Sequence, residues 1–118
     1  MKIKIYQIDS NKDNGKLKFL NYECTIKRTR GMIASDSYSC VYIGEVECKG
    51  LEDVYRKFNV DKPDSFKGHS MSVSDIVEVV ESDEIESGLY FCDSIGFKKV
   101  VFKTERTAQE QGRSAINE

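Results

Sequence analysis

Short runs of β-forming residues, separated by turn signals, constrain the fold of this chain most strongly. Ile3 and Ile5 alternate with charged residues, which is the period-two pattern of a half-buried strand. The longest run spans residues 39–47, where Gly44 indicates a bulge. Further strands are expected at residues 76–80, 89–92 and 97–102. A sheet is therefore the expected centre of the fold.

One segment has the periodicity of a helix instead. In residues 51–58 the apolar side chains recur at i, i+3, i+4 and i+7 and form a single stripe: Leu51, Val54, Tyr55 and Phe58. Acidic residues occupy the first turn and basic residues the last, so the pairs Glu52–Arg56 and Asp53–Lys57 are expected. A helix of about two turns must be stabilised by packing on the sheet.

The other segments carry weaker patterns. Residues 17–26 are expected to form a short strand or an irregular crossing segment, and residues 27–37 a loop. Residues 93–96 are expected to be the turn of a hairpin in which Gly96 is free to adopt positive φ. The prediction is an α+β domain over residues 1–102: a curved, mainly antiparallel sheet, open or partly closed into a barrel, with one short amphipathic helix packed on it. Residues 103–118, poor in hydrophobic residues, are expected to be a disordered tail.

Length and composition exclude several classes of protein. A chain of 118 residues with 39% hydrophobic residues is typical of one globular domain. No apolar run approaches the roughly 18 residues of a membrane span, and the charged start does not resemble a signal peptide. We therefore expect a cytoplasmic protein without membrane association. Its four cysteines form no Cys-x-x-Cys pair and are expected to be free thiols: Cys24, Cys40, Cys48 and Cys92.

Charge is distributed unevenly along the chain. Residues 1–34 carry a net charge of +5, residues 35–97 carry −9 and residues 98–118 carry +2. The overall charge of −2 lacks the basic excess of a general nucleic-acid binder. A local basic face within residues 12–30, together with aromatic side chains on the sheet, leaves a nucleic-acid-binding module as an alternative function. The acidic part includes a connection between two strands that we call the acidic connection: Glu81, Asp83, Glu84 and Glu86.

The one histidine lies among serines and an aspartate, which raises the question of hydrolysis. Ser70, Ser72, Ser74 and Asp75 all lie within six positions of His69. A catalytic triad usually brings its members from separate elements, and such bunched residues more often hydrogen-bond nearby backbone groups. Neither a metal-ligand spacing nor a phosphate-binding glycine motif occurs. We expect no enzymatic activity, no metal and no cofactor.

Three motifs, in order, carry a resemblance to a known family. They are the helical segment LEDVYRKFN at residues 51–59, the stretch GHSMSVSDIV at 68–77 and the turn DSIGF at 93–97. Together with the intervening residues they cover about half of the chain. On these motifs the chain resembles the YodL-like domain, a family found in conjugative elements, plasmids and phages of Firmicutes.

The resemblance implies that the stretch before residue 76 and the hairpin turn lie close together. We expect Gly68, Ser72, Asp75 and Gly96 to build a structural corner there. The remaining matched positions are candidates for a binding surface: Lys67, His69, Ser70, Asp93, Ser94 and Phe97.

The resemblance also implies a function class. We expect a non-enzymatic accessory protein of a mobile genetic element that binds a host or element protein, for example as an inhibitor of host defence of the anti-restriction or anti-CRISPR type. The acidic connection could then compete for a surface that normally binds nucleic acid. Oligomeric state and partner identity do not follow from these residues.

Overall fold

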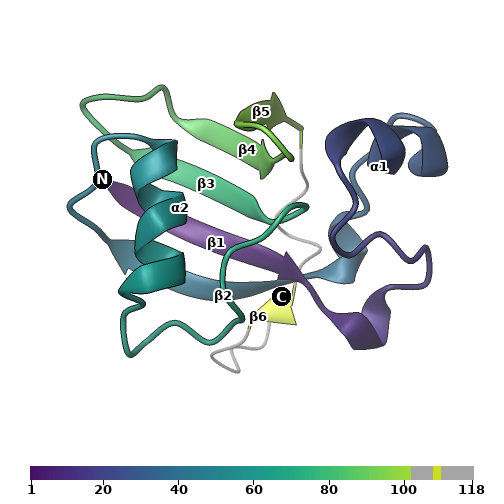
Figure 1. The fold of residues 1–118 in the computed structure, drawn as a ribbon, viewed down its shortest axis with the longest axis horizontal. Helices are drawn as coiled ribbons and strands as arrows, with labels where there is room; N and C mark the ends of the chain where they lie inside the picture. Colours follow the sequence, from purple (N-terminus) through teal and green to yellow (C-terminus); the bar gives the residue numbers. More distant parts are fainter. Residues whose placement is uncertain (102–107, 110–118) are drawn as a thin grey trace, which may run out of the picture.

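A computed structural model describes residues 1–101 and 108–109 of the chain (Figure 1). Two short 3₁₀ turns, η1 (Ser10–Lys12) and η2 (Ser35–Ser37), accompany the helices and strands. In chain order these are β1 (Lys2–Ile8), α1 (Tyr22–Thr29), β2 (Tyr38–Glu45), α2 (Leu51–Val60), β3 (Ile76–Glu81), β4 (Gly88–Cys92), β5 (Phe97–Val100) and β6 (Ala108–Gln109). Within the described residues no helix is long and apolar enough to cross a membrane.

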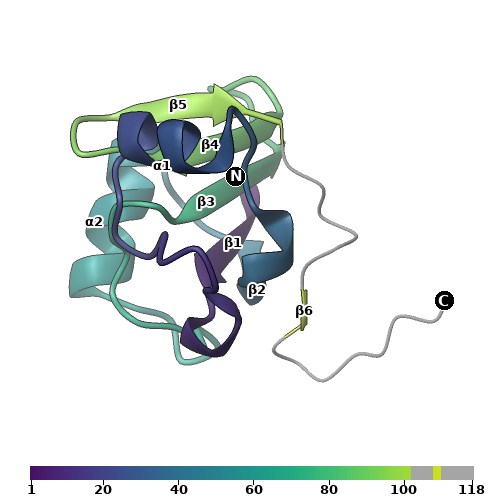
Figure 2. The same ribbon diagram turned by 90° about the vertical axis from the view of Figure 1, so that its right-hand side faces the viewer.

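The strands form one sheet in the order β5-β4-β3-β1-β2-β6. Strands β1 to β5 pair with one another in antiparallel fashion, whereas the two residues of β6 pair in parallel with Ser39 and Cys40 of β2. The α+β class and the antiparallel sheet are therefore confirmed. The barrel is not, because β5 and β6 lie at opposite edges and the sheet stays open (Figure 2).

Helix α2 covers one face of the sheet, as its apolar stripe predicts. Val54 and Phe58 are fully buried against strand residues that include Ile5 and Val77. The Phe58 ring meets Tyr42 edge to face, with 4.9 Å between ring centroids. The helix runs two residues further than expected, to Val60.

The prediction of which residues form ion pairs on α2 is wrong. The sequence pattern favours Glu52–Arg56 and Asp53–Lys57, whereas the structure pairs Arg56 with Asp53 at 2.9 Å and Lys57 with Asp61 at 3.8 Å. The reason is the N-terminus of α2, where Gly50 has no side chain with which to cap the helix. Asp53 turns back to accept a hydrogen bond from the Lys49 N–H, and this bond with the Arg56 contact lowers the pKa of Asp53.

The other face of the sheet is covered by α1, which the sequence pattern did not predict. A smaller core lies there, built from Tyr6, Tyr38, Ile76 and Phe91, with Tyr22 of α1 against the Phe91 ring. Residues 22–29 are helical instead of a strand and loop because both helix ends are capped. The Asn21 side chain accepts from the Cys24 N–H at 2.9 Å, and Arg30 adopts the left-handed conformation at the other end.

The bulge expected at Gly44 lies elsewhere. Gly44 pairs in regular register with Ile3. The register shifts between Ile5, which is opposite Tyr42, and Tyr6, which is opposite Cys40. Val41 is therefore the extra residue of β2.

Other expectations are confirmed. Val77 and Val79 share the buried face under α2. Residues 93–96 form the hairpin turn between β4 and β5, with Gly96 at φ 73°. The four cysteines are free thiols; Cys40 and Cys92 are buried on strands, and Cys24 lies on α1. The predicted tail at 103–118 lies outside the described residues apart from Ala108–Gln109.

Candidate binding site

Gln7, a polar residue buried at the end of β1, is the centre of the corner that the family motifs build. Its side-chain N–H₂ donates to the His69 carbonyl at 2.8 Å and to the Asp75 carboxyl at 2.9 Å. Its side-chain oxygen accepts from the His69 N–H at 3.1 Å. Because one buried amide satisfies three partners on the stretch before β3, it fixes that stretch to the first strand.

Asp75 is the most deeply buried acidic group of the described residues, with 1% of its surface exposed. Its Oδ2 accepts both the Gln7 bond and one from the Ser72 N–H at 2.9 Å. Burial raises the pKa of Asp75 to about 8, although these two hydrogen bonds act in the opposite direction. Because Oδ2 already accepts two hydrogen bonds, the neutral carboxyl carries its proton on Oδ1.

Ser74 and Asp75 join the motif stretch to the hairpin. The Ser74 N–H donates to the Cys92 carbonyl at 2.9 Å, and the Cys92 N–H donates to the Asp75 carbonyl at 2.8 Å. The Tyr38 hydroxyl donates to the Ser74 carbonyl at 2.6 Å, while the Ser74 hydroxyl accepts from the Phe19 N–H at 3.0 Å. The two motifs thus lie side by side, as the resemblance implies.

Gly68 is required by the close approach of Gln7. A Cβ at position 68 would overlap the Gln7 Oε1 and lie 2.9 Å from its Cδ and 3.1 Å from the Val41 Cγ2. Any larger residue would displace the buried amide.

His69 is held by a backbone carbonyl and by an aromatic ring. Its Nδ1 lies 2.7 Å from the Ser70 carbonyl oxygen, so Nδ1 carries the proton and donates. Burial, together with the nearby Lys18 and Lys62, lowers the pKa of His69, although the Ser70 bond opposes this. The ring packs edge-on against Phe19 at 5.6 Å. Neither a serine hydroxyl nor a carboxylate is bonded to it among the described residues, so the hydrogen-bonded chain of a triad is not formed.

The candidate surface residues are divided between two places. Lys67 and His69 line a small cavity of about 410 Å³ beside the end of β1, with both polar and apolar groups in its lining. Asp93 and Ser94 lie at the hairpin turn, and Phe97 packs toward the α2 side of the sheet. Ser70 accepts a hydrogen bond from Lys62 at 3.0 Å.

The segment before α1 lies between these two groups and contacts both. Phe19 touches the His69 ring, and the Tyr22 N–H donates to Asp93 at 3.0 Å. Asp93 therefore caps α1 from the hairpin, which explains its place in the motif.

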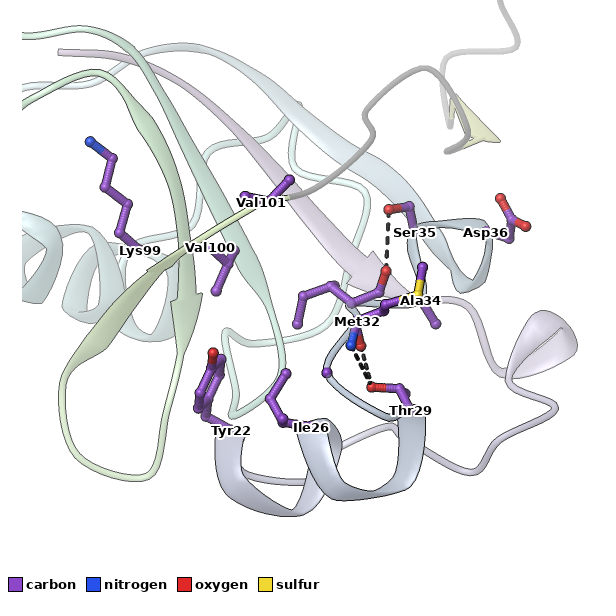
Figure 3. Close-up of a pocket in the computed structure, with 12 residues that line it drawn as sticks. Tyr22, Ile26, Thr29, Met32, Ala34, Ser35, Asp36, Lys99, Val100 and Val101 are labelled. Atoms are coloured by element: carbon purple, nitrogen blue, oxygen red, sulfur yellow. Dashed lines mark hydrogen bonds between the residues drawn. The ribbon is translucent and has the colours of Figure 1, made fainter.

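A second, larger cavity lies between α1 and β5, and we call it the α1–β5 groove. It has a volume of about 980 Å³, and its lining is mostly apolar. Figure 3 shows Val100, Tyr22, Ile26 and Met32 pointing into the same space, whereas the Lys99 side chain points away. The groove is lined by Tyr22, Ile26, Thr29, Gly31, Met32, Ile33, Ala34, Ser35, Asp36, Lys99, Val100 and Val101.

Two apolar side chains at this groove are conspicuously exposed. Met32 is 65% exposed and Val101 is 86% exposed. The backbone around Met32 is nevertheless held in place: its N–H donates to the Thr29 hydroxyl at 3.2 Å, and the same hydroxyl bonds the Met32 carbonyl (Figure 3). An exposed methionine at an apolar cavity is typical of a recognition surface.

Five aromatic side chains were candidates for base stacking: Tyr6, Tyr22, Tyr42, Tyr90 and Phe97. Tyr22 lies on α1 and lines the groove, whereas the other four lie elsewhere. Tyr6 and Tyr42 are buried in the two cores. Tyr90 and Phe97 are half-buried and pack toward the α2 side. These four side chains present no open aromatic surface of the kind that stacks on bases.

The acidic side chains gather at the exposed β3–β4 connection. Within the acidic connection, Glu81 is 3.8 Å from Lys2 and Glu86 is 3.0 Å from Lys99. Across the residues that the structure describes, no three His, Cys, Asp or Glu side chains are grouped so that they could hold a metal ion.

The groove could not be found from the sequence because its walls come from segments about 70 positions apart. Residues 22–36 had been expected to form a strand and a loop, and residues 99–101 a hairpin strand. The available signals were the Tyr22–Ile26 spacing of i, i+4 and the apolar pair Met32–Ile33 in a polar stretch.

Comparisons with known proteins agree with the motif corner. Neither the comparison with curated proteins nor that with solved structures gave a match. The model of the YodL-like domain family matches residues 2–102, a range that contains the corner and nearly the whole sheet. The chain therefore belongs to the YodL-like domain family.

Proposed function

We propose that this chain is a non-enzymatic accessory protein that works by binding another protein. The observation that carries the proposal is the α1–β5 groove, an apolar cavity with Met32 and Val101 exposed at its rim. Cavities of this size that are mostly apolar are typical of binding sites. Apolar side chains gathered in the open are expensive to leave in water, and a partner that covers them stabilises the complex.

The hydrogen bonds made by the motif residues support a binding role over catalysis. Asp75 is bonded to Gln7 and to backbone, and the Nδ1 of His69 to a carbonyl. These polar groups stabilise the corner, and the corner in turn positions α1 beside the hairpin. In this proposal the family motif is the scaffold of the groove.

Membership of the family supports a proposal for the origin of this protein and for the class of protein that it binds. We place the protein in a mobile genetic element of Firmicutes, acting in the cytoplasm. The partner class we propose is a host-defence protein, as for an anti-restriction or anti-CRISPR inhibitor. A version in which the acidic connection competes with nucleic acid uses a second surface, since those side chains lie at the β3–β4 connection and not in the groove lining.

The test is affinity capture of the tagged full chain from a Firmicute lysate, with and without nuclease, followed by mass spectrometry. Three proteins are compared: the wild type, the double variant Met32→Asp/Val101→Asp, and the control Val60→Asp. Val60 is 79% exposed at the end of α2, so its substitution adds a charge in place of an exposed apolar residue away from the groove.

We expect one stoichiometric protein partner that survives nuclease, is captured equally by the control, and is lost from the double variant. Equal capture by all three proteins would contradict the groove as the binding site. A set of molecules that disappears with nuclease would instead favour the nucleic-acid-binding alternative.

A further inference from the structure

The strand beside the groove has an unpaired edge. Among the described residues β5 is the terminal strand and pairs only with β4. The Asp93 N–H donates to the Gly96 carbonyl at 2.9 Å, so this is a hydrogen-bonded pair at the turn. Because such pairs alternate along an antiparallel ladder, the next are Phe91 with Lys98 and Leu89 with Val100.

The same alternation fixes which backbone groups of β5 face outward. The N–H and C=O groups of Phe97 and Lys99 point away from β4, toward the unpaired edge. This edge lies next to the groove, since Lys99, Val100 and Val101 form one of its walls. An extended segment paired with β5 would therefore have backbone partners on the strand and side-chain space in the groove.

Within the region that the structure describes, two cations at this place are not paired with carboxylates, and Asp36 is the one acidic residue among the residues that line the groove. Lys98 is exposed, with its Nζ 5.7 Å from the centroid of the Tyr22 ring. Arg30 is exposed between the lining residues Thr29 and Gly31. In the described part of the chain neither takes part in an ion pair, whereas Lys99 is paired with Glu86 and Lys27 with Glu23.

We propose that the partner contributes an extended, acidic segment that adds as a strand to the edge of β5, with apolar side chains entering the groove on the Val100 side. The alternating apolar residues fill the space among Val100, Ile26 and Met32. The aspartates and glutamates of the partner segment, which lie between or beside these apolar residues, form ion pairs with Lys98 and Arg30. This inference rests on the proposed function and names the chemistry of the segment bound.

A second copy of this chain is a poor occupant of the same edge. Two β5 strands side by side would bring Lys98 and Lys99 of both copies together, and like charges across a ladder are destabilising. An acidic segment turns the same lysines into attractive contacts.

The experiment starts from a displayed library of random nine-residue peptides, selected on the tagged full chain and counter-selected on Met32→Asp/Val101→Asp. We expect the enriched peptides to alternate apolar residues and to carry Asp or Glu. Enrichment of basic peptides, of apolar residues at helical spacing, or of nothing beyond the counter-selection would overturn the proposal.

The most enriched peptide then serves as the labelled probe in fluorescence anisotropy. Two methylated versions of this peptide are made, one with the backbone nitrogens of the odd positions methylated and one with those of the even positions. Methylation removes these hydrogen-bond donors and keeps every side chain. Only one of the two sets of N–H groups faces β5, so we expect one of the two peptides to lose affinity by about tenfold or more. Lys98→Glu and Arg30→Glu should each weaken binding about tenfold, and replacing the acids of the peptide by lysines should restore it. Lys49→Glu is the charge control, because Lys49 is exposed just before α2, on the face of the sheet opposite to α1. Unchanged affinity for both methylated peptides would refute strand addition.

The two proposals fail in different ways. If the lysate partner depends on the groove but the selected peptides are basic or helical, protein binding stands and the extended acidic segment is refuted. If the lysate partner does not depend on the groove, the proposed function fails whatever peptides the library yields.

Discussion

Asp75 provides the sharpest test of the corner, because its protonation links the fold to pH. Burial raises the pKa of Asp75 to about 8 in the folded chain, against an ordinary value of 3.8. Between these two values the unfolded chain has released the proton and the folded chain keeps it. Stability must therefore fall as pH rises through this window, by about 1.4 kcal/mol for each pH unit. From pH 5 to pH 7 the loss attributable to Asp75 is about 2.5 kcal/mol.

The substitution that isolates this effect is Asp75→Asn. Asparagine keeps one carboxamide oxygen to accept from Gln7 and from the Ser72 N–H, and its N–H₂ takes the place of the protonated Oδ1. The variant should fold, and it carries no proton to release. Every other titrating group is common to both proteins, so the difference between their stability curves reports Asp75 alone.

The assay is urea unfolding followed by circular dichroism at pH 5, 6 and 7. We expect the free energy of unfolding of the wild type to fall relative to Asp75→Asn by about 2.5 kcal/mol across this range. Asp75→Ala should be less stable than Asp75→Asn by about 3 kcal/mol at every pH, because it leaves two buried donors without partners and a cavity. Parallel curves for wild type and Asp75→Asn would refute the buried neutral carboxyl.

Three further predictions concern the corner, the groove and the acidic connection. Gly68→Ala should lower the free energy of unfolding by about 2–3 kcal/mol, since its Cβ displaces Gln7, while Gly50→Ala, with nothing within 4 Å, should change it by less than about 1 kcal/mol in the same urea titration. Asp93→Ala removes the hydrogen bond to the Tyr22 N–H and should lower the free energy of unfolding by about 1 kcal/mol. Relative to the wild type, amide exchange should become faster in α1 than in α2, and unchanged exchange in α1 would contradict the capping role. Replacing all four acids of the acidic connection by lysine should leave capture of the lysate partner intact if the groove is the binding site, and loss of capture would show that charge competition takes part.

The parts of the fold that were predictable are those specified by local patterns. The stripe on α2 lies within ten residues, and the β4–β5 hairpin is joined by a four-residue turn. Helix α1 was missed because its apolar stripe contains only Tyr22 and Ile26, and because Asp93, one of its caps, comes from 71 positions away.

The candidate site was less predictable for the same reason. A glutamine in a strand such as Gln7 gives no local sign that it will be buried, since its partners are 62 and 68 positions distant. The motif stretch was correctly expected to lie beside the hairpin, but only through the family resemblance. The groove depends on a helix that was not expected, so no pattern in one segment could indicate it.

The amide of Gln7 has a consequence for how this chain folds. It closes a loop of more than sixty residues. Its bonds to His69 and Asp75 form only when β1 and the stretch before β3 are both in their folded positions. For contacts of such long sequence separation the chain loses loop-closure entropy before the stabilising contacts form. Folding should therefore be slow for a domain of this length. Within the described residues the His69 N–H is bonded to this side chain alone, so it should exchange with solvent no faster than the whole domain unfolds.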